Sequence, residues 1–247
     1  MNKVMIATPA FAGQCSMIFA DCLEKLSKAF TDHGVESQIE YICNESILHK
    51  GRNYLAHRFM ESDCSHMFFI DADMAFKAED GLTMLKANKD VIAGAGPRKM
   101  MEWKRIIAMA KAGFSEEVIK HASSPVVVSM FENTNEITYD QPFPVKGVGT
   151  AFMLIKRNVF EKIKVRSSKI PTPFLGDWVN VPMWFDNDVV DGNFVSEDYT
   201  FCKYARKAGF EIHLAPWVIL KHIGTHVFEG CLWCSNGSVV HEKPKPT

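Results

Sequence analysis

The sequence predicts an α/β fold in which a mainly parallel central sheet is flanked by helices. Apolar runs typical of buried strands alternate, over the first hundred residues, with segments whose apolar side chains recur at helical spacing. The expected strands are residues 3–7, 36–42, 67–70 and 91–94. The helices expected between them lie within residues 16–30, 52–60 and 77–86. Because strands and helices take turns along the chain, crossover connections and parallel pairing are expected.

Each element follows from a local pattern. Residues 3–7 and 67–70 are apolar runs of the kind buried on both faces, whereas residues 36–42 alternate in polarity. Beyond residue 96 the pattern changes, with a strand expected at residues 145–155 and an irregular loop at residues 171–195. Ser196 is a favourable N-cap, so a last helix is expected to follow it.

Length and composition limit the class of protein. The 247 residues show no internal repeat and no linker, so we expect one domain over residues 1–240 and a flexible tail over residues 241–247. A net charge of -1 argues against a nucleic-acid binder driven by charge alone. No apolar run approaches the roughly 20 residues of a membrane-spanning helix. Seven scattered cysteines and a strand pattern close to Met1 favour a cytoplasmic protein without a signal peptide.

Two aspartates follow the apolar run at residues 67–70, and they are the first candidates for chemistry. Asp71 and Asp73 are separated by one small residue, so extended backbone would project both carboxylates the same way. Carboxylates at the carboxyl end of a buried strand are suited to a divalent cation with bound phosphates. A polar loop that solvates the strand end is the alternative. The loops after the other strands are expected at the same edge of the sheet, which favours a site.

Four short segments resemble, in their order and spacing, the GT-A glycosyltransferases, and among them small family-2-like members from bacteria and large DNA viruses. These segments are residues 71–73 (Asp-Ala-Asp), 147–152 (Gly-Val-Gly-Thr-Ala-Phe), 196–199 (Ser-Glu-Asp-Tyr) and 222–226 (His-Ile-Gly-Thr-His). The resemblance covers about residues 3–230. It implies a single GT-A domain that transfers a sugar from a nucleotide-sugar donor, with UDP as the expected nucleotide, to an acceptor hydroxyl.

The resemblance also assigns roles to residues. The metal ligands, for Mn²⁺ or Mg²⁺, would be Asp73, Asp71 and His222, with His226 in reserve. Asp198 would be the general base, with Glu197 beside it for the acceptor or as an alternative base, which implies inversion at the sugar carbon. A retaining course stays open. The residues expected to bind the donor are Thr8, Pro9, Glu45, Arg52, Asp71, Lys99, Gly149 and Thr150.

Other readings compete with each of these roles. Glu197 and Asp198 could simply favour the start of a helix, and His222 could be an interior histidine. A metal-dependent nucleotidyltransferase could use the aspartates, and a carbohydrate-binding module could use loop tryptophans such as Trp178. The acceptor is open among a glycan, a lipid-linked sugar, a protein and a modified nucleobase in DNA. No integral membrane association is expected.

Overall fold

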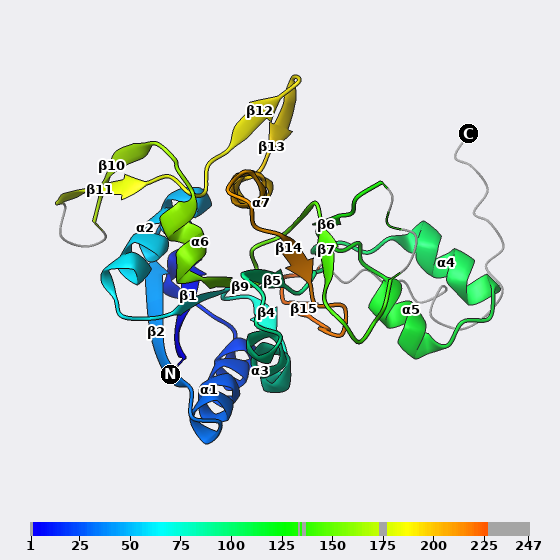
Figure 1. Cartoon of the computed structure of the whole chain (residues 1–247). Helices are drawn as coiled ribbons and strands as arrows, with labels where there is room; N and C mark the ends of the chain where they lie inside the picture. Colours follow the sequence, from blue (N-terminus) through cyan, green and yellow to red (C-terminus); the bar gives the residue numbers. More distant parts are fainter. Residues whose placement is uncertain (1, 133, 135–136, 173–176, 227–247) are drawn as a thin grey trace.

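The fold is built around a seven-stranded sheet with the strand order β2-β1-β3-β9-β5-β14-β7. The computed structural model describes residues 2–132, 134, 137–172 and 177–226 (Figure 1). In sheet order, the strands are Glu36–Cys43, Lys3–Ala10, His66–Ile70, Phe152–Lys156, Val91–Ala93, Ile212–Leu214 and Phe143–Val145. β9 is antiparallel to β3 and β5, and β7 is antiparallel to β14, so the other five strands share one direction. The predicted α/β class with a mainly parallel sheet is confirmed.

Helices cover both faces of this sheet. On one face lie α1 (Met17–Asp32) and α3 (Ala78–Lys86), which contact each other. On the other face lie α2 (Leu48–Glu61), α6 (Arg157–Lys162) and α7 (Glu197–Lys207). A short 3-10 helix, η1 (Phe11–Gly13), follows β1.

The sheet separates two apolar cores, and β3 contributes to both because its side chains alternate. Met67 and Phe69 pack with α2, α6 and α7, whereas Phe68 and Ile70 pack with α1 and α3. Every residue of β3 is buried. The uninterrupted apolar run in the sequence therefore reflects a strand covered on both faces, as predicted.

Three expected boundaries were wrong. The predicted strand at 145–155 is divided among β7, β8 (Gly147–Val148) and β9, with a turn between β8 and β9. The predicted irregular loop at 171–195 contains most of two antiparallel hairpins, β10–β11 (Ser167–Pro171 and Trp178–Pro182) and β12–β13 (Asp188–Val190 and Asn193–Val195). Their strands are short and largely exposed, so they lack the apolar periodicity that marks a strand in sequence. β1 also continues through Pro9, beyond the last residue paired with β3, where a missing N–H is tolerated.

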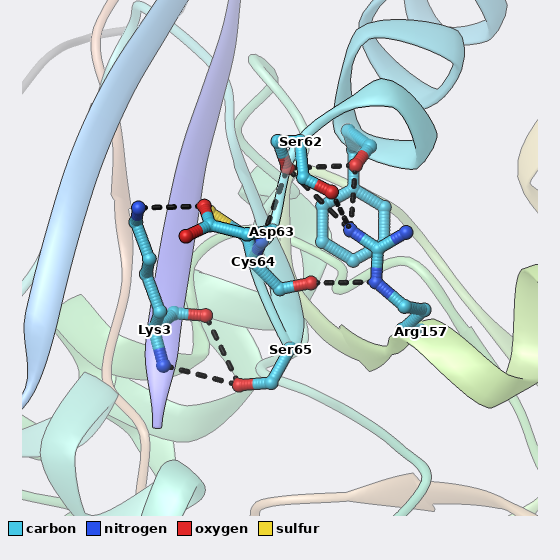
Figure 2. A network of polar contacts seen from close by, with 7 residues as sticks. Lys3, Ser62, Asp63, Cys64, Ser65 and Arg157 are labelled. Carbon is cyan, nitrogen blue, oxygen red and sulfur yellow. Dashed lines mark hydrogen bonds and ion pairs between the residues drawn. The ribbon is translucent and has the colours of Figure 1, made fainter. Parts of the chain in front are cut away.

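Arg157 holds the end of α2 and the loop that leads into β3 (Figure 2). Its guanidinium donates hydrogen bonds to the carbonyls of Phe59 at 2.8 Å, Ser62 at 2.8 Å and Cys64 at 2.7 Å. The carbonyls at a helix end lack intrahelical donors, so one arginine satisfies several of them at once. Lys3 closes the same loop through an ion pair with Asp63. This network fixes α2, which carries part of the candidate site, against β1 and β3.

Residues 97–126 form an excursion from the sheet that contains α4 (Trp103–Lys111) and α5 (Glu116–Ala122). Gly113 adopts a φ of +79° between them, a conformation that favours glycine and separates the two helices. Figure 1 shows both helices at one side of the molecule, and β6 (Val128–Ser129) follows them in the sequence. No helix in the described part of the chain is long and apolar enough to cross a membrane. The predicted tail at 241–247 lies outside the described residues.

Candidate active site

The two aspartates after β3 do not project together, which corrects the expectation from extended geometry. Residues 71–73 form a turn in which the N–H of Met74 donates to the Asp71 carbonyl at 3.1 Å. The strand alternation is lost at this point, so the carboxylates separate. Asp71 accepts a hydrogen bond from Arg52 at 3.3 Å, and Asp73 meets Lys99 and His222 instead.

Asp73 shares one oxygen between two basic side chains. Its Oδ2 lies 2.5 Å from Lys99 Nζ and 3.2 Å from His222 Nε2. These two partners, His222 first, outweigh the effect of burial and lower the pKa of Asp73 to about 2. The hydrogen bond to Asp73 raises the pKa of His222 above its ordinary value. A carboxylate and an imidazole predicted from distant parts of the sequence therefore meet.

Backbone pairing between two segments far apart in the sequence brings Asp73 and His222 together. β4 (Met74–Ala75) pairs with β15 (Lys221–His222), which places His222 opposite Met74, and the N–H of Ile223 donates to the Asp73 carbonyl at 2.7 Å. Gly224 leaves room for Lys99, because a Cβ at that position would lie 2.9 Å from Lys99 Cδ. The glycine of the His-x-Gly motif thus lets Lys99 reach Asp73.

The donor atoms at Asp73 and His222 fit a divalent cation. His222 Nδ1 lies 2.8 Å from the Pro97 carbonyl, and since a carbonyl only accepts, Nδ1 carries the proton. In the neutral ring Nε2 then has the lone pair, an arrangement typical of metal-binding histidines. Two ligands at right angles on one ion, each about 2.1 Å from it, lie about 3.0 Å apart, close to the 3.2 Å between Nε2 and Oδ2. Among the described residues no group of three or more His, Cys, Asp or Glu could hold a metal, so other ligands would come from substrate and water.

Arg52 is the centre of a second cluster, in which one buried cation faces three carboxylates. It lies on α2 with 2% of its side chain exposed. Besides Asp71, its guanidinium lies 3.6 Å from Glu197 and 3.9 Å from Asp198 at the start of α7. Arg52 Nε and Nη1 and Asp71 Oδ1 are buried without a hydrogen-bond partner in the described structure. Unpartnered buried polar atoms at one place indicate room for a water or a ligand.

The charges of this cluster do not balance, and the pKa shifts reflect it. Burial, reinforced by Asp198, raises the pKa of Glu197 despite Arg52. Burial likewise raises the pKa of Asp71, with contributions from Asp198 and Asp73. For Arg52, burial opposes the charge, but the three carboxylates dominate and raise its pKa. The cluster therefore favours the approach of a further cation.

Asp198 is held by a hydroxyl and faces a cavity. Thr150, fully buried, donates from Oγ1 to Asp198 Oδ1 at 2.5 Å. The second oxygen, Oδ2, lies above Gly149, where an added Cβ would be 3.8 Å away. The cavity has a volume of about 170 Å³. Its lining residues are Leu48, Arg52, Asp71, Met74, Gly96, Pro97, Val127, Gly149, Thr150, Ala151, Asp198 and His222.

The structure thus gathers most of the predicted residues and leaves three apart. Thr8, Pro9 and Glu45 do not line this cavity. Thr8 is buried in β1, and its hydroxyl has no hydrogen-bond partner in the described structure. Glu45 pairs with Lys50 at 2.5 Å at the start of α2. These three lie along the ends of β1 and β2, and their predicted contact with a nucleotide stays a prediction.

Two residues position the site in ways that the sequence did not predict. The Pro97 carbonyl orients His222, a role that no side-chain pattern could reveal. Asn53, next to Arg52 on α2, accepts from the Phe185 N–H at 2.9 Å and donates to the Phe185 carbonyl at 2.5 Å. A buried polar residue inside a helix was the available signal. This double hydrogen bond ties the segment before α7 to α2.

Comparisons with known proteins identify fold similarity. No protein-family model and no curated protein sequence matches the chain. The structure of A197 from STIV has a TM-score of 0.50 and 16% identity, and covers 91% of this chain and 87% of that one. S. aureus TarS 1-349 in complex with UDP-GlcNAc gives a TM-score of 0.42 and 12% identity over 86% of this chain and 55% of that one. The inositol-1-phosphate CTP transferase from T. maritima has a TM-score of 0.41 and 10% identity, and covers 90% of this chain and 89% of that one.

The chain has an α/β fold of the GT-A type, with its mainly parallel sheet flanked by helices. At 16% identity, the similarity to A197 concerns the fold and not the chemistry of the site. This chain spans about half of the TarS 1-349 chain. The function must therefore be argued from the side chains around Asp73, Arg52 and Asp198.

Proposed function

We propose that this protein is a metal-dependent glycosyltransferase that moves a sugar from a nucleotide-sugar donor, with UDP as the nucleotide, to an acceptor hydroxyl. The observation that carries the proposal is one cavity bordered by three different functions. Its lining includes His222, the partner of Asp73, together with the buried cation Arg52 and the carboxylate of Asp198. A transfer between a diphosphate-linked sugar and a hydroxyl needs a cation for the diphosphate and a base for the hydroxyl.

Asp73 and His222 are the proposed metal ligands. A bound Mn²⁺ or Mg²⁺ would neutralise the charge that develops on the departing nucleoside diphosphate. The imidazole ligand favours Mn²⁺ over Mg²⁺. Asp71 is turned away toward Arg52, so we assign it to the donor, with its unpartnered Oδ1 as an acceptor for a ribose hydroxyl or a metal-bound water.

Asp198 is the proposed general base. Its Oδ2 would take the proton of the acceptor hydroxyl as the acceptor oxygen bonds to the anomeric carbon. The bond between that carbon and the phosphate oxygen breaks, and its electron pair leaves with the nucleoside diphosphate. Thr150 fixes the carboxylate through Oδ1, and Gly149 leaves space at Oδ2. Displacement from the face opposite the leaving group would invert the sugar carbon.

The remaining residues support binding in this proposal. Glu197 does not line the cavity, but it contacts Arg52. We therefore assign Glu197 to the electrostatics of the Arg52 cluster and not to the role of general base. Lys99, half-exposed beside Asp73, can swing toward the donor phosphates. Thr8, Pro9 and Glu45 would contact the nucleoside at the ends of β1 and β2. We place the protein in the cytoplasm.

A donor-hydrolysis screen tests the proposal. Purified protein with Mn²⁺ is incubated with UDP-sugars, GDP-sugars and nucleoside triphosphates, and the released nucleotide is measured. We expect turnover of a sugar nucleotide that is lost in Asp73→Asn. Asp21→Asn is the matched control, because Asp21 is also paired with a lysine, Lys25, but lies exposed on α1 and does not line the cavity.

Two outcomes would overturn the proposal. Release of pyrophosphate from triphosphates alone would favour a nucleotidyltransferase instead. Sugar-nucleotide turnover that is equal in Asp73→Asn and in the wild-type protein would remove the role of Asp73. In either case the position of Asp198 would have to be explained by its place at the start of α7.

A further inference from the structure

The excursion at residues 97–126, which we call the helical hairpin, contains no buried residue. α4 and α5 both lack buried side chains. The hairpin nevertheless carries seven large apolar side chains that are 44–59% exposed. They are Met100, Met101, Trp103, Ile107, Phe114, Val118 and Val126. Three of them, Trp103, Ile107 and Val118, lie on α4 and α5, and the other four lie in the segments that flank these helices. Single exposed apolar residues are ordinary, but seven within one hairpin mark a surface that meets a partner.

The hairpin is held firmly at its base. Pro97 forms a bridge with Val126, and the N–H of Glu102 donates to the Ser123 carbonyl at 2.8 Å. These contacts fix the two ends of the hairpin against each other, and three of the exposed apolar side chains lie on its helices. Trp103 and Ile107 are one turn apart on α4 and share a face.

The charge of the hairpin differs from that of the rest of the chain. It contains six Lys or Arg and three Glu, a net charge of +3, whereas the whole chain carries -1 and the remainder thus carries -4. Two of its glutamates are paired within the hairpin, Glu102 with Arg105 and Glu116 with Lys120. Lys104 and Lys111 have no ion-pair partner among the described residues. Two lysine side chains without an ion pair thus lie beside the face of α4 that carries Trp103 and Ile107.

A groove of about 800 Å³ runs beside the hairpin and reaches the candidate active site. Its lining includes Trp103 and Lys120 of the hairpin, and Lys221 and His222 of the segment around β15. None of the described residues that line it is an aspartate or glutamate. The apolar and cationic surface is therefore continuous with the side of the site where His222 lies.

We propose that the helical hairpin is a docking surface for the face of an anionic lipid bilayer. Helices with tryptophan and aliphatic residues on one face and lysines beside it lie in the interface between water and lipid. Anionic headgroups would meet Lys104 and Lys111, while Trp103 and Ile107 enter the acyl boundary. Binding of this kind needs no membrane-spanning helix.

The same observations disfavour two other partners. A second copy bound through the same face would bring two surfaces of net charge +3 together. A single-stranded nucleic acid would use the cations and Trp103, but it would leave Ile107, Phe114 and Val118 exposed to water. A bilayer surface accommodates the charge and the aliphatic side chains together.

Vesicle co-sedimentation tests the proposal with the full chain, without donor or metal, so its result does not depend on the proposed transfer activity. We expect binding to vesicles of phosphatidylglycerol and phosphatidylcholine, weaker binding in high salt, and no binding to phosphatidylcholine alone. Trp103→Ala with Ile107→Ala should weaken binding on the order of tenfold. Lys104→Gln with Lys111→Gln should weaken it by roughly thirtyfold at low ionic strength. Trp178→Ala, a tryptophan that is 66% exposed on β11, should have no effect.

Because the changed side chains are exposed, the variants should keep the thermal midpoint of the wild type, and circular dichroism verifies this. Lack of binding to the anionic vesicles at low salt would overturn the proposal. So would binding that the hairpin variants do not weaken, or that Trp178→Ala weakens equally. A Trp103-dependent dimer, or binding to a single-stranded oligonucleotide without vesicle binding, would assign the surface to one of the two rejected partners.

Discussion

Replacing Lys99 with glutamine should separate two roles that this lysine combines. Lys99 Nζ and His222 Nε2 lie on the same oxygen of Asp73. A metal ion held by Asp73 and His222 must displace Lys99 from that oxygen. Lys99→Gln removes the competing positive charge and should therefore tighten Mn²⁺ binding.

The structure sets the size of the effect. Lys99 and Asp73 are 44% and 40% exposed, so the pair is largely solvated and is worth about 0.2–1 kcal/mol. A displaced ammonium about 5 Å from a divalent ion would add roughly 1.7 kcal/mol of repulsion in bulk water, before screening and rotation of the flexible side chain reduce it. We expect a net gain of about 1 kcal/mol, which is about a fivefold lower Kd for Mn²⁺.

Isothermal titration of Mn²⁺ into the protein without donor measures this Kd. Lys221→Gln is the matched control, since Lys221 precedes His222 on β15 but makes no ion pair with a described residue. The Kd of Lys221→Gln for Mn²⁺ should differ from that of the wild type by less than about twofold, because exposed charges are screened. If Lys99 also contacts the donor phosphates, the KM for the donor should rise in Lys99→Gln while Mn²⁺ binding improves.

A weaker Mn²⁺ affinity in Lys99→Gln would refute this reasoning. It would mean that the lysine supports the metal site, for example by fixing the orientation of Asp73. An equal gain in Mn²⁺ affinity in Lys99→Gln and Lys221→Gln would show that the net charge of the protein controls Mn²⁺ binding, and not competition at the shared Asp73 oxygen.

Three further perturbations follow from the same structure. Asp198→Asn should lower donor turnover by about 10²–10⁴-fold while the Kd for Mn²⁺ stays unchanged; normal turnover would exclude Asp198 as the base. Burial and Lys156 lower the pKa of His66 to about 4. Between pH 6.5 and 4, the His66 imidazole is therefore neutral in the folded protein but protonated in the unfolded chain. Stability should therefore fall as pH drops from 6.5 toward 4, by up to about 3 kcal/mol, and urea unfolding should show a flatter pH dependence in His66→Gln. Arg157→Met should lower the free energy of unfolding at pH 7 by about 3 kcal/mol in the same urea assay, because it removes the donor to the loop carbonyls of Ser62 and Cys64; a loss below about 1 kcal/mol would show that water replaces the arginine.

The sequence predicted the core of the fold well, because the apolar residues of a buried helix or strand recur at a regular spacing along the chain. The apolar run of β3 and the helical spacing of α1 and α3 appear at nearly the expected bounds. The hairpins β10–β11 and β12–β13 could not be predicted in this way. They bury little, so their residues are not constrained to alternate.

The sequence named residues that the fold brings close together, but it did not predict their contacts. Asp73, His222 and Asp198 were chosen by motif, and each lies at or beside the cavity. The separation of Asp71 from Asp73 depends on a turn that the residues Asp-Ala-Asp do not specify. The Pro97 carbonyl that orients His222 is a backbone group. Every residue has such a carbonyl, so the type of residue at position 97 could not predict this contact.

Arg52 shows most clearly why contacts need the structure. From the sequence it was expected to bind the donor, yet its guanidinium lies among three carboxylates, one just after β3 and two at the start of α7. One buried positive charge cannot neutralise three negative ones. Burial first, and the neighbouring carboxylates second, raise the pKa values of Asp71 and Glu197, although Arg52 lowers both. A divalent cation at Asp73 would reduce this imbalance, whereas a diphosphate alone would increase it. Donor and metal should therefore bind cooperatively at this site, with the metal needed before the diphosphate can approach Arg52.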